Sequence, residues 1–346
     1  MISQSLKEIF EKKDFLALMD LGLLIPFNIY WIKNSGVKTL LNRKGDFCNI
    51  RKVISYKNKG AQIEIDSQLS EAWLLGFIDQ LNKLASLEAQ VNTSPSDIQK
   101  WRKEFIKIVV ETLWEDGEEV SRLDVCFAVG IFFCNLDEDT ERLFLSLPIE
   151  IQRKNYLTAA FGVIFGILLG YTDINILKDY FSILLFLDYP FSSSMWSEQE
   201  KDYLIQSRKN TLNVSELNQV TKLKIEMKYL DLLEKYQNDL GTIIKNKSFL
   251  KYLEYSFERF DGSGFPKGLS QNNLSDIDCM TIFLYSCFSF EEDLDEPPQE
   301  MILKKIFYQN EENKDFYLNT RLETLFLSTI EKIQEYDDSF LKISGL

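Results

Sequence analysis

The segment that decides the fold is Asn155–Thr172, NYLTAAFGVIFGILLGYT, the longest run of the chain without a charged residue. Three glycines and several polar residues interrupt it, so its apolar part is shorter than the roughly 20 residues that a membrane-spanning helix needs. The segment is also too apolar for a surface helix. We therefore expect a helix buried at the centre of the protein, and no membrane span.

Most of the chain around this segment carries helical patterns. From Leu69 onward apolar residues recur at helical spacing, as in Ile98, Trp101 and Phe105, and Pro95 precedes them as a start signal. With only 15 glycines and 7 prolines, the chain is suited to long helices with short connections. A long amphipathic helix is predicted over 216–239, where it would lie on the domain or contact a partner.

The N-terminal part has a different pattern. A short amphipathic helix is predicted within residues 1–20. The β-forming run Pro26–Ile32, the turn residues Asn34–Gly36 and the apolar run Val37–Leu41 predict a hairpin, and Ala61–Ile65 predicts a third strand. The expected fold class is mainly α: a small N-terminal α/β module (1–68), a helical linker region (69–148) and a helical domain (149–346) that begins after Pro148.

Composition excludes several classes of function. Of the 346 residues 45% are apolar, which is enough for a sizeable core, and the net charge is −14. An acidic chain repels phosphate backbones, so we expect no nucleic-acid partner. The chain has no histidine, which excludes Ser-His-Asp and Cys-His catalysis and histidine-ligated metal centres.

The cysteines indicate the compartment. There are five, an odd number, without a Cys-x-x-Cys pair, and we interpret them as small buried hydrophobes of a reducing environment. The N-terminus lacks the apolar segment of a signal peptide. The expected location is therefore the cytoplasm.

One segment differs from the helical background: ERFDGSGFPKGL, Glu258–Leu269, with three glycines and one proline. Such a composition predicts an irregular loop between a helix ending near Phe257 and a helix starting near Asp276. A glycine-rich backbone can approach a phosphate group or a protein partner closely. The plain alternative is a connection between two helices.

This segment resembles the hallmark of the HD-GYP phosphodiesterases, the family that cleaves cyclic di-GMP, in which His-His-Glu-x-x-Asp-Gly-Ser-Gly-Tyr-Pro is the characteristic run. The resemblance extends from Glu258 to Pro266, with Phe265 in place of the tyrosine. Both histidines are absent, and Ser256 and Phe257 stand in their places.

Other parts of the family's pattern follow in the same register over about 150–300, and 21–68 resembles a small module that often precedes such domains. The defining His-Asp pair falls on Leu187 and Asp188. Two further ligand histidines fall near Lys154 and on Ser207, and a ligand aspartate falls near Tyr285. The interval from Ser207 to Ser256 is longer than the family's.

The resemblance implies a helical bundle of the HD type and, in active members, metal-assisted hydrolysis of a phosphodiester. Among the ligand positions only Asp188 and Glu258 keep a carboxylate. Two carboxylates cannot hold a multinuclear centre, and apolar side chains remove the polarity that metal and water require. We therefore expect no catalytic residue, no metal and no cofactor: a pseudoenzyme.

The expected function is that of an interaction module in cyclic-dinucleotide signalling, with a protein partner such as a diguanylate-cyclase-type domain. Phe265 and Pro266 are expected to form an exposed apolar tip. One alternative is a metal-free receptor for cyclic di-GMP or another nucleotide, with Arg259 and Lys267 meeting its phosphates. The other is a hydrolase that uses carboxylates alone. The predicted partner-binding residues are Glu258, Arg259, Asp261, Gly262, Ser263, Gly264, Phe265, Pro266 and Lys267.

Overall fold

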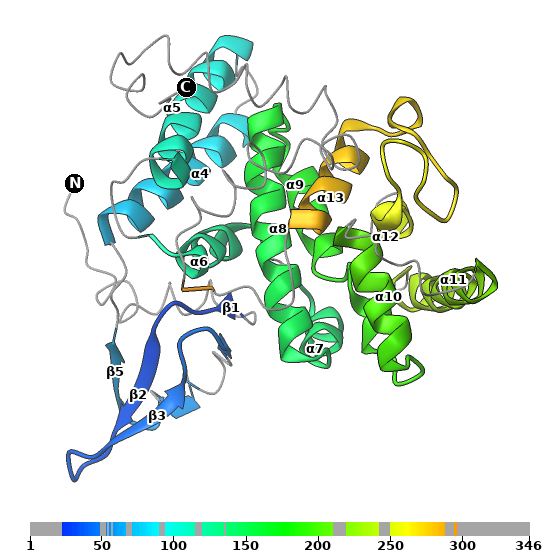
Figure 1. The fold of residues 1–346 in the computed structure, drawn as a ribbon. Helices are drawn as coiled ribbons and strands as arrows, with labels where there is room; N and C mark the ends of the chain where they lie inside the picture. The colour runs from blue at the N-terminus through cyan, green and yellow to red at the C-terminus, as the bar shows by residue number, and fades with distance from the viewer. Residues whose placement is uncertain are drawn as a thin grey trace.

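A computed structural model describes residues 23–48, 53, 55–56, 58–66, 71–89, 94–114, 120–134, 136–209, 219–241, 250–287 and 294–295. The described part is mainly helical with small antiparallel sheets near the N-terminus (Figure 1). This confirms the predicted fold class. The predicted helix within 1–20 lies outside the described residues.

The strands form two small sheets. A two-stranded sheet pairs β1 (Leu23–Leu24) with β4 (Phe47–Cys48). The other sheet has the order β3-β2-β5 and is antiparallel throughout. Its strands are β2 (Asn28–Ile32), β3 (Lys38–Asn42) and β5 (Gln62–Asp66). The predicted hairpin and third strand are confirmed, and Gly36, with a φ of 78°, occupies the turn.

The helices of the first half are α4 (Glu71–Ala89), α5 (Pro95–Trp114), α6 (Arg122–Phe133) and α7 (Glu138–Leu145). They are followed by α8 (Ile149–Leu169), α9 (Ile174–Leu184), the 3₁₀ turn η1 (Tyr189–Ser192) and α10 (Glu198–Lys209). The last described elements are α11 (Gln219–Gly241), α12 (Leu250–Glu254), the 3₁₀ turns η4 (Tyr255–Phe257) and η5 (Gln271–Asn273), and α13 (Asp276–Cys287).

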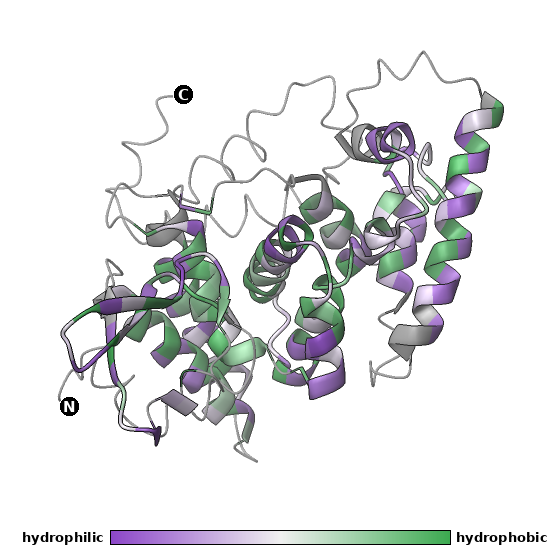
Figure 2. Ribbon diagram, turned by 90° about the horizontal axis from the view of Figure 1, so that it is seen from below, coloured by the Kyte–Doolittle hydropathy of each residue, from purple (hydrophilic) through white to green (hydrophobic). Residues whose placement is uncertain are grey.

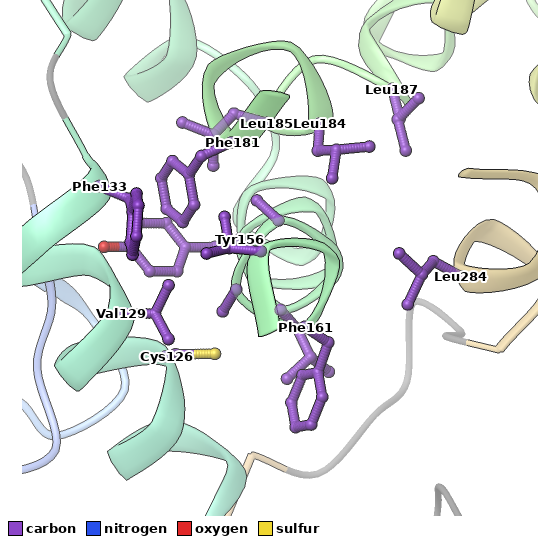
Figure 3. Packing of buried hydrophobic residues seen from close by; sticks show 14 of the residues in the cluster. Cys126, Val129, Phe133, Tyr156, Phe161, Phe181, Leu184, Leu185, Leu187 and Leu284 are labelled. Carbon is purple, nitrogen blue, oxygen red and sulfur yellow. The ribbon is translucent and has the colours of Figure 1, made fainter. Parts of the chain in front are cut away.

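The centre of the fold is α8, the helix predicted from the uncharged segment. It is buried along most of its length and packs against α5, α6, α7, α9 and α13. Figure 3 shows Phe133 of α6 and Phe181 of α9 beside Tyr156 of α8. A Cβ at Gly162 would collide with Leu184, so this glycine allows α9 to approach closely.

The N-terminal module is fixed to this central helix. The Arg153 guanidinium on α8 donates to the Gly45 carbonyl at 2.9 Å and pairs with Asp46 at 3.0 Å. One hydrophobic cluster includes Leu24 of β1, Phe127 of α6 and Leu284 of α13. The three segments predicted from the sequence therefore contribute to one continuous core.

Two further expectations concern apolar residues. No helix among the described ranges is long and apolar enough to cross a membrane. The four cysteines with described side chains (Cys48, Cys126, Cys134 and Cys279) are buried, as predicted. Burial raises the pKa of Cys48 to about 12, so its thiol is protonated at neutral pH.

Candidate functional site

A buried group of charged and polar side chains lies between α8 and α13. The Lys154 ammonium is 2.7 Å from Oδ2 of Asp188, and these side chains are 1% and 0% exposed. The Tyr285 hydroxyl donates to Oδ1 of the same carboxylate at 2.6 Å. The ammonium also lies 4.3 Å from the centroid of the Tyr285 ring. We call Lys154, Asp188 and Tyr285 the ionic centre.

Three separate elements supply the ionic centre. Lys154 lies in the second turn of α8, Asp188 is the residue before η1, and Tyr285 lies in α13. Removing a carboxylate and an ammonium from water costs several kcal/mol per ion, and their attraction offsets this cost only when both are well hydrogen-bonded. Here the carboxylate accepts at both oxygens, and the tyrosine ring faces the ammonium.

An aromatic cluster borders the ionic centre. The Phe257 ring meets the Tyr285 ring edge-on at 5.7 Å, stacks on Phe265 at 4.8 Å and lies 4.7 Å from Tyr229. Leu187 is fully buried beside Asp188 in the chain. The Tyr285 ring, whose hydroxyl binds the Asp188 carboxylate, is therefore packed against aromatic carbon.

The segment Glu258–Leu269, which we call the glycine loop, is held by an internal carboxylate. Glu258 is 1% exposed, and its two oxygens accept the backbone N–H groups of Lys267 and Leu269, each at 2.7 Å. Burial raises the pKa of the Glu258 carboxyl, although both N–H groups lower it. The contribution of Glu258 to stability is therefore largest at low pH and falls as the pH rises through this pKa.

Glycines fix the path of the glycine loop. A Cβ at Gly264 would lie 2.5 Å from the Cα of Glu258 and from the carbonyl oxygen of Phe257, both backbone atoms. Gly262 has a φ of 79°, which favours glycine. The Asp261 carboxylate accepts the backbone N–H of Ser263 at 2.9 Å. The loop is thus a defined structure whose exposed side chains are Asp261, Ser263 and Lys267.

The structure corrects the expected exposure of two side chains. Phe265 is half-buried and packs on Phe257 and Tyr229, because the close approach of Gly264 turns the loop back onto the bundle. Arg259, expected to face phosphates, is 8% exposed. The exposed Lys267 pairs with Glu254 at 3.1 Å. The predicted exposed apolar tip is therefore wrong, and so is the expected exposure of Arg259, whereas Lys267 is exposed.

The other predicted positions are distributed around the same region. Ser256 is buried and donates to the Leu253 carbonyl at 2.9 Å. Pro266 is half-buried. Ser207 lies in α10, and its side chain is outside the described set. The structure thus brings Lys154, Asp188, Phe257 and Tyr285 together, and Phe265 of the glycine loop packs on Phe257.

The sequence analysis did not predict the ion pair between Lys154 and Asp188. A detectable signal was present: a lysine just before the uncharged segment, and one aspartate inside the apolar run Ile183–Tyr189. Two lone charges of opposite sign beside buried segments predict a pair, because an isolated buried charge is too costly.

The residues present do not fit a metal ion. An ammonium already lies at hydrogen-bond distance from the Asp188 carboxylate, and a second cation there would be repelled at short range. The Glu258 carboxylate is occupied by two backbone N–H groups. In the described ranges no three His, Cys, Asp or Glu side chains are grouped so that they could hold a metal.

The aromatic cluster leads to a first prediction, on Phe265→Ala. Because the ring is half-buried on Phe257, we expect the free energy of unfolding to fall by about 2 kcal/mol, part of the cost at a fully buried phenylalanine. Urea unfolding measures this loss. Val37→Ala, at a side chain more than half exposed, is the control and should change stability little. An unchanged unfolding midpoint for Phe265→Ala would mean that the ring does not pack on the bundle.

Comparison with known proteins identifies no relative: no protein-family model, no curated protein and no solved structure matches this chain.

Proposed function

We propose that this chain is a catalytically inactive, HD-GYP-like protein that works as an interaction module in cyclic-dinucleotide signalling. The observation that carries the proposal is the ionic centre. At positions where the resemblance implies metal ligands, the chain has its own cation, Lys154, against Asp188 and beneath Tyr285. A protein that keeps the family's loop but has a lysine in place of the metal has lost the hydrolytic activity and retains the loop as a binding surface.

The glycine loop supports a binding role. The Glu258 carboxylate binds two backbone N–H groups of the loop, and a Cβ at Gly264 would collide with backbone atoms. A loop that is ordered before binding loses less entropy when a partner docks. Its exposed polar residues, Asp261, Ser263 and Lys267, suit the polar rim of a protein interface.

The proposed partner is a diguanylate-cyclase-type domain, and cyclic di-GMP itself is the competing ligand. The buried position of Arg259 and the ion pair of Lys267 with Glu254 disfavour a phosphate site at the loop. The net charge of −14 also repels a doubly anionic nucleotide.

The test is calorimetric titration of the purified chain with cyclic di-GMP and, separately, with a purified diguanylate-cyclase-type domain. We expect no heat of binding with the nucleotide and saturable binding of the domain. Lys267→Glu, in the loop, should weaken that binding by about tenfold, as truncation of an interface contact does. Lys201→Glu, on α10, is the matched control and should not.

Two outcomes contradict the proposal. Saturable binding of cyclic di-GMP that Lys267→Glu abolishes would establish the nucleotide receptor instead. Failure of the cyclase-type domain to bind would exclude the proposed partner.

A further inference from the structure

Helix α11 has two apolar faces: one packs on the described part of the protein, and the other is exposed. Ile225, Tyr229 and Leu233 are buried against the remainder of the fold. On the opposite side Val220, Leu223 and Met227 are 62%, 52% and 63% exposed. Figure 2 shows hydrophobic residues alternating with hydrophilic ones along α11, at the edge of the molecule. Exposed apolar side chains that adjoin on one face are a feature of protein interaction sites.

The exposed stripe has the spacing of a coiled coil. Val220 and Met227 occupy successive a positions of a heptad, and Leu223 and Leu230 occupy the d positions that follow each of them. Leu230 is half-buried and borders the stripe. Because the other face holds α11 in place, a second helix could dock here without the cost of helix formation.

The charged residues beside the stripe are complementary between two antiparallel copies of α11. Lys224 and Asp231 are exposed and occupy the same e position of consecutive heptads. In an antiparallel pair of identical helices, e positions face e positions across the seam. With Met227 of one helix opposite Leu230 of the other, Lys224 of each copy lies opposite Asp231 of the second copy. A parallel pair would instead place Glu226 beside Asp231, which is repulsive.

We propose that α11 pairs with α11 of a second copy of this chain, antiparallel, through Met227 and Leu230. A two-fold axis generates each contact twice, so the two Lys224–Asp231 pairs form together. This contact is independent of the proposed function, since it involves neither the glycine loop nor a nucleotide. In this register the side chains of Met227 and Leu230 lie nearest the axis, where the flexible thioether of Met227 fills an irregular gap well.

The net charge of −14 per chain opposes self-association. This repulsion acts over a long range and is largely screened at about 0.15 M salt, where the Debye length is about 8 Å. The contacts in the seam are shorter than this length and persist. Dimer formation should therefore be measured at that salt concentration.

The experiment is sedimentation velocity of the full chain between about 1 and 100 µM at about 0.15 M salt. We expect a monomer–dimer equilibrium, and we expect Met227→Glu to abolish it. Leu145→Glu, at an exposed leucine of α7, is the matched control and should leave the dimer intact. Circular dichroism verifies that each variant is folded.

A charge exchange tests the antiparallel register. Lys224→Asp and Asp231→Lys should each weaken the dimer by about tenfold or more, because each creates two like-charge pairs. The double variant Lys224→Asp/Asp231→Lys should restore the wild-type dissociation constant. A chain that stays monomeric at 100 µM, or a dimer that Met227→Glu leaves unchanged, overturns the proposal. A double variant as weak as the single ones overturns the antiparallel arrangement.

Discussion

Lys154→Met should lower the free energy of unfolding by about 3–5 kcal/mol at pH 7, the usual cost of breaking a buried ion pair from one side. Methionine fills nearly the volume of the lysine chain but leaves the Asp188 carboxylate without its cation in a fully buried place. Urea unfolding gives the value.

Lys228→Met provides a control with matched contacts. The Lys228 ammonium also touches a carboxylate, that of Glu200 at 2.8 Å, and an aromatic ring, that of Trp196 at 4.7 Å. The difference is exposure, since both side chains of that pair are 25% exposed. We expect a loss of at most about 1 kcal/mol there.

A second variant separates charge from packing. In Lys154→Met/Asp188→Asn both charges are removed while the amide oxygen can still accept from Tyr285, so more than half of the lost stability should return. If Lys154→Met lowers the free energy of unfolding no more than Lys228→Met does, the buried ion pair does not stabilise the fold.

Gly264→Ala should destabilise the protein by about 2–3 kcal/mol, the upper range for forcing extra atoms into a packed site. The added methyl group meets backbone atoms of Phe257 and Glu258, which cannot rotate away as a side chain can. The Glu258 carboxylate should then lose its contacts with Lys267 and Leu269. Hydrogen exchange of these two amides reports the opening of the loop.

Gly76→Ala is the control for the chemistry of the substitution. Gly76 lies within α4, and a Cβ there has no other atom within 4 Å. Alanine should stabilise that helix by about 0.5–1 kcal/mol, the opposite sign. Equal effects of the two substitutions would contradict the close backbone contact at Gly264.

Local signals in the sequence were sufficient to predict the positions of several helices and strands. An uncharged apolar run predicted the buried helix α8, and Asn34–Gly36 predicted the turn between β2 and β3. Pro95 marked the first residue of α5, and the helix expected to start near Asp276 begins there. Periodicity and turn chemistry depend on neighbouring residues, which is why these predictions succeed.

The contacts between side chains could not be predicted from the sequence in the same way. Lys154 and Asp188 are 34 positions apart, and Asp188 and Tyr285 are 97 apart, so only packing brings them together. The direction of Phe265 depends on the contact of Gly264 with the backbone of Phe257, Glu258 and Arg259, which precede it in the same irregular segment. Exposure in an irregular loop follows from such contacts and has no periodic signature.

Metal reconstitution tests most directly our proposal that the ionic centre lies where related enzymes would hold a metal centre. The purified chain is incubated anaerobically with excess Fe²⁺ or Mn²⁺, desalted, analysed for bound metal by mass spectrometry and assayed for cyclic di-GMP hydrolysis. We predict far less than one equivalent of metal and no turnover. One or more equivalents of bound metal, with hydrolysis that Asp188→Ala abolishes, would contradict the account.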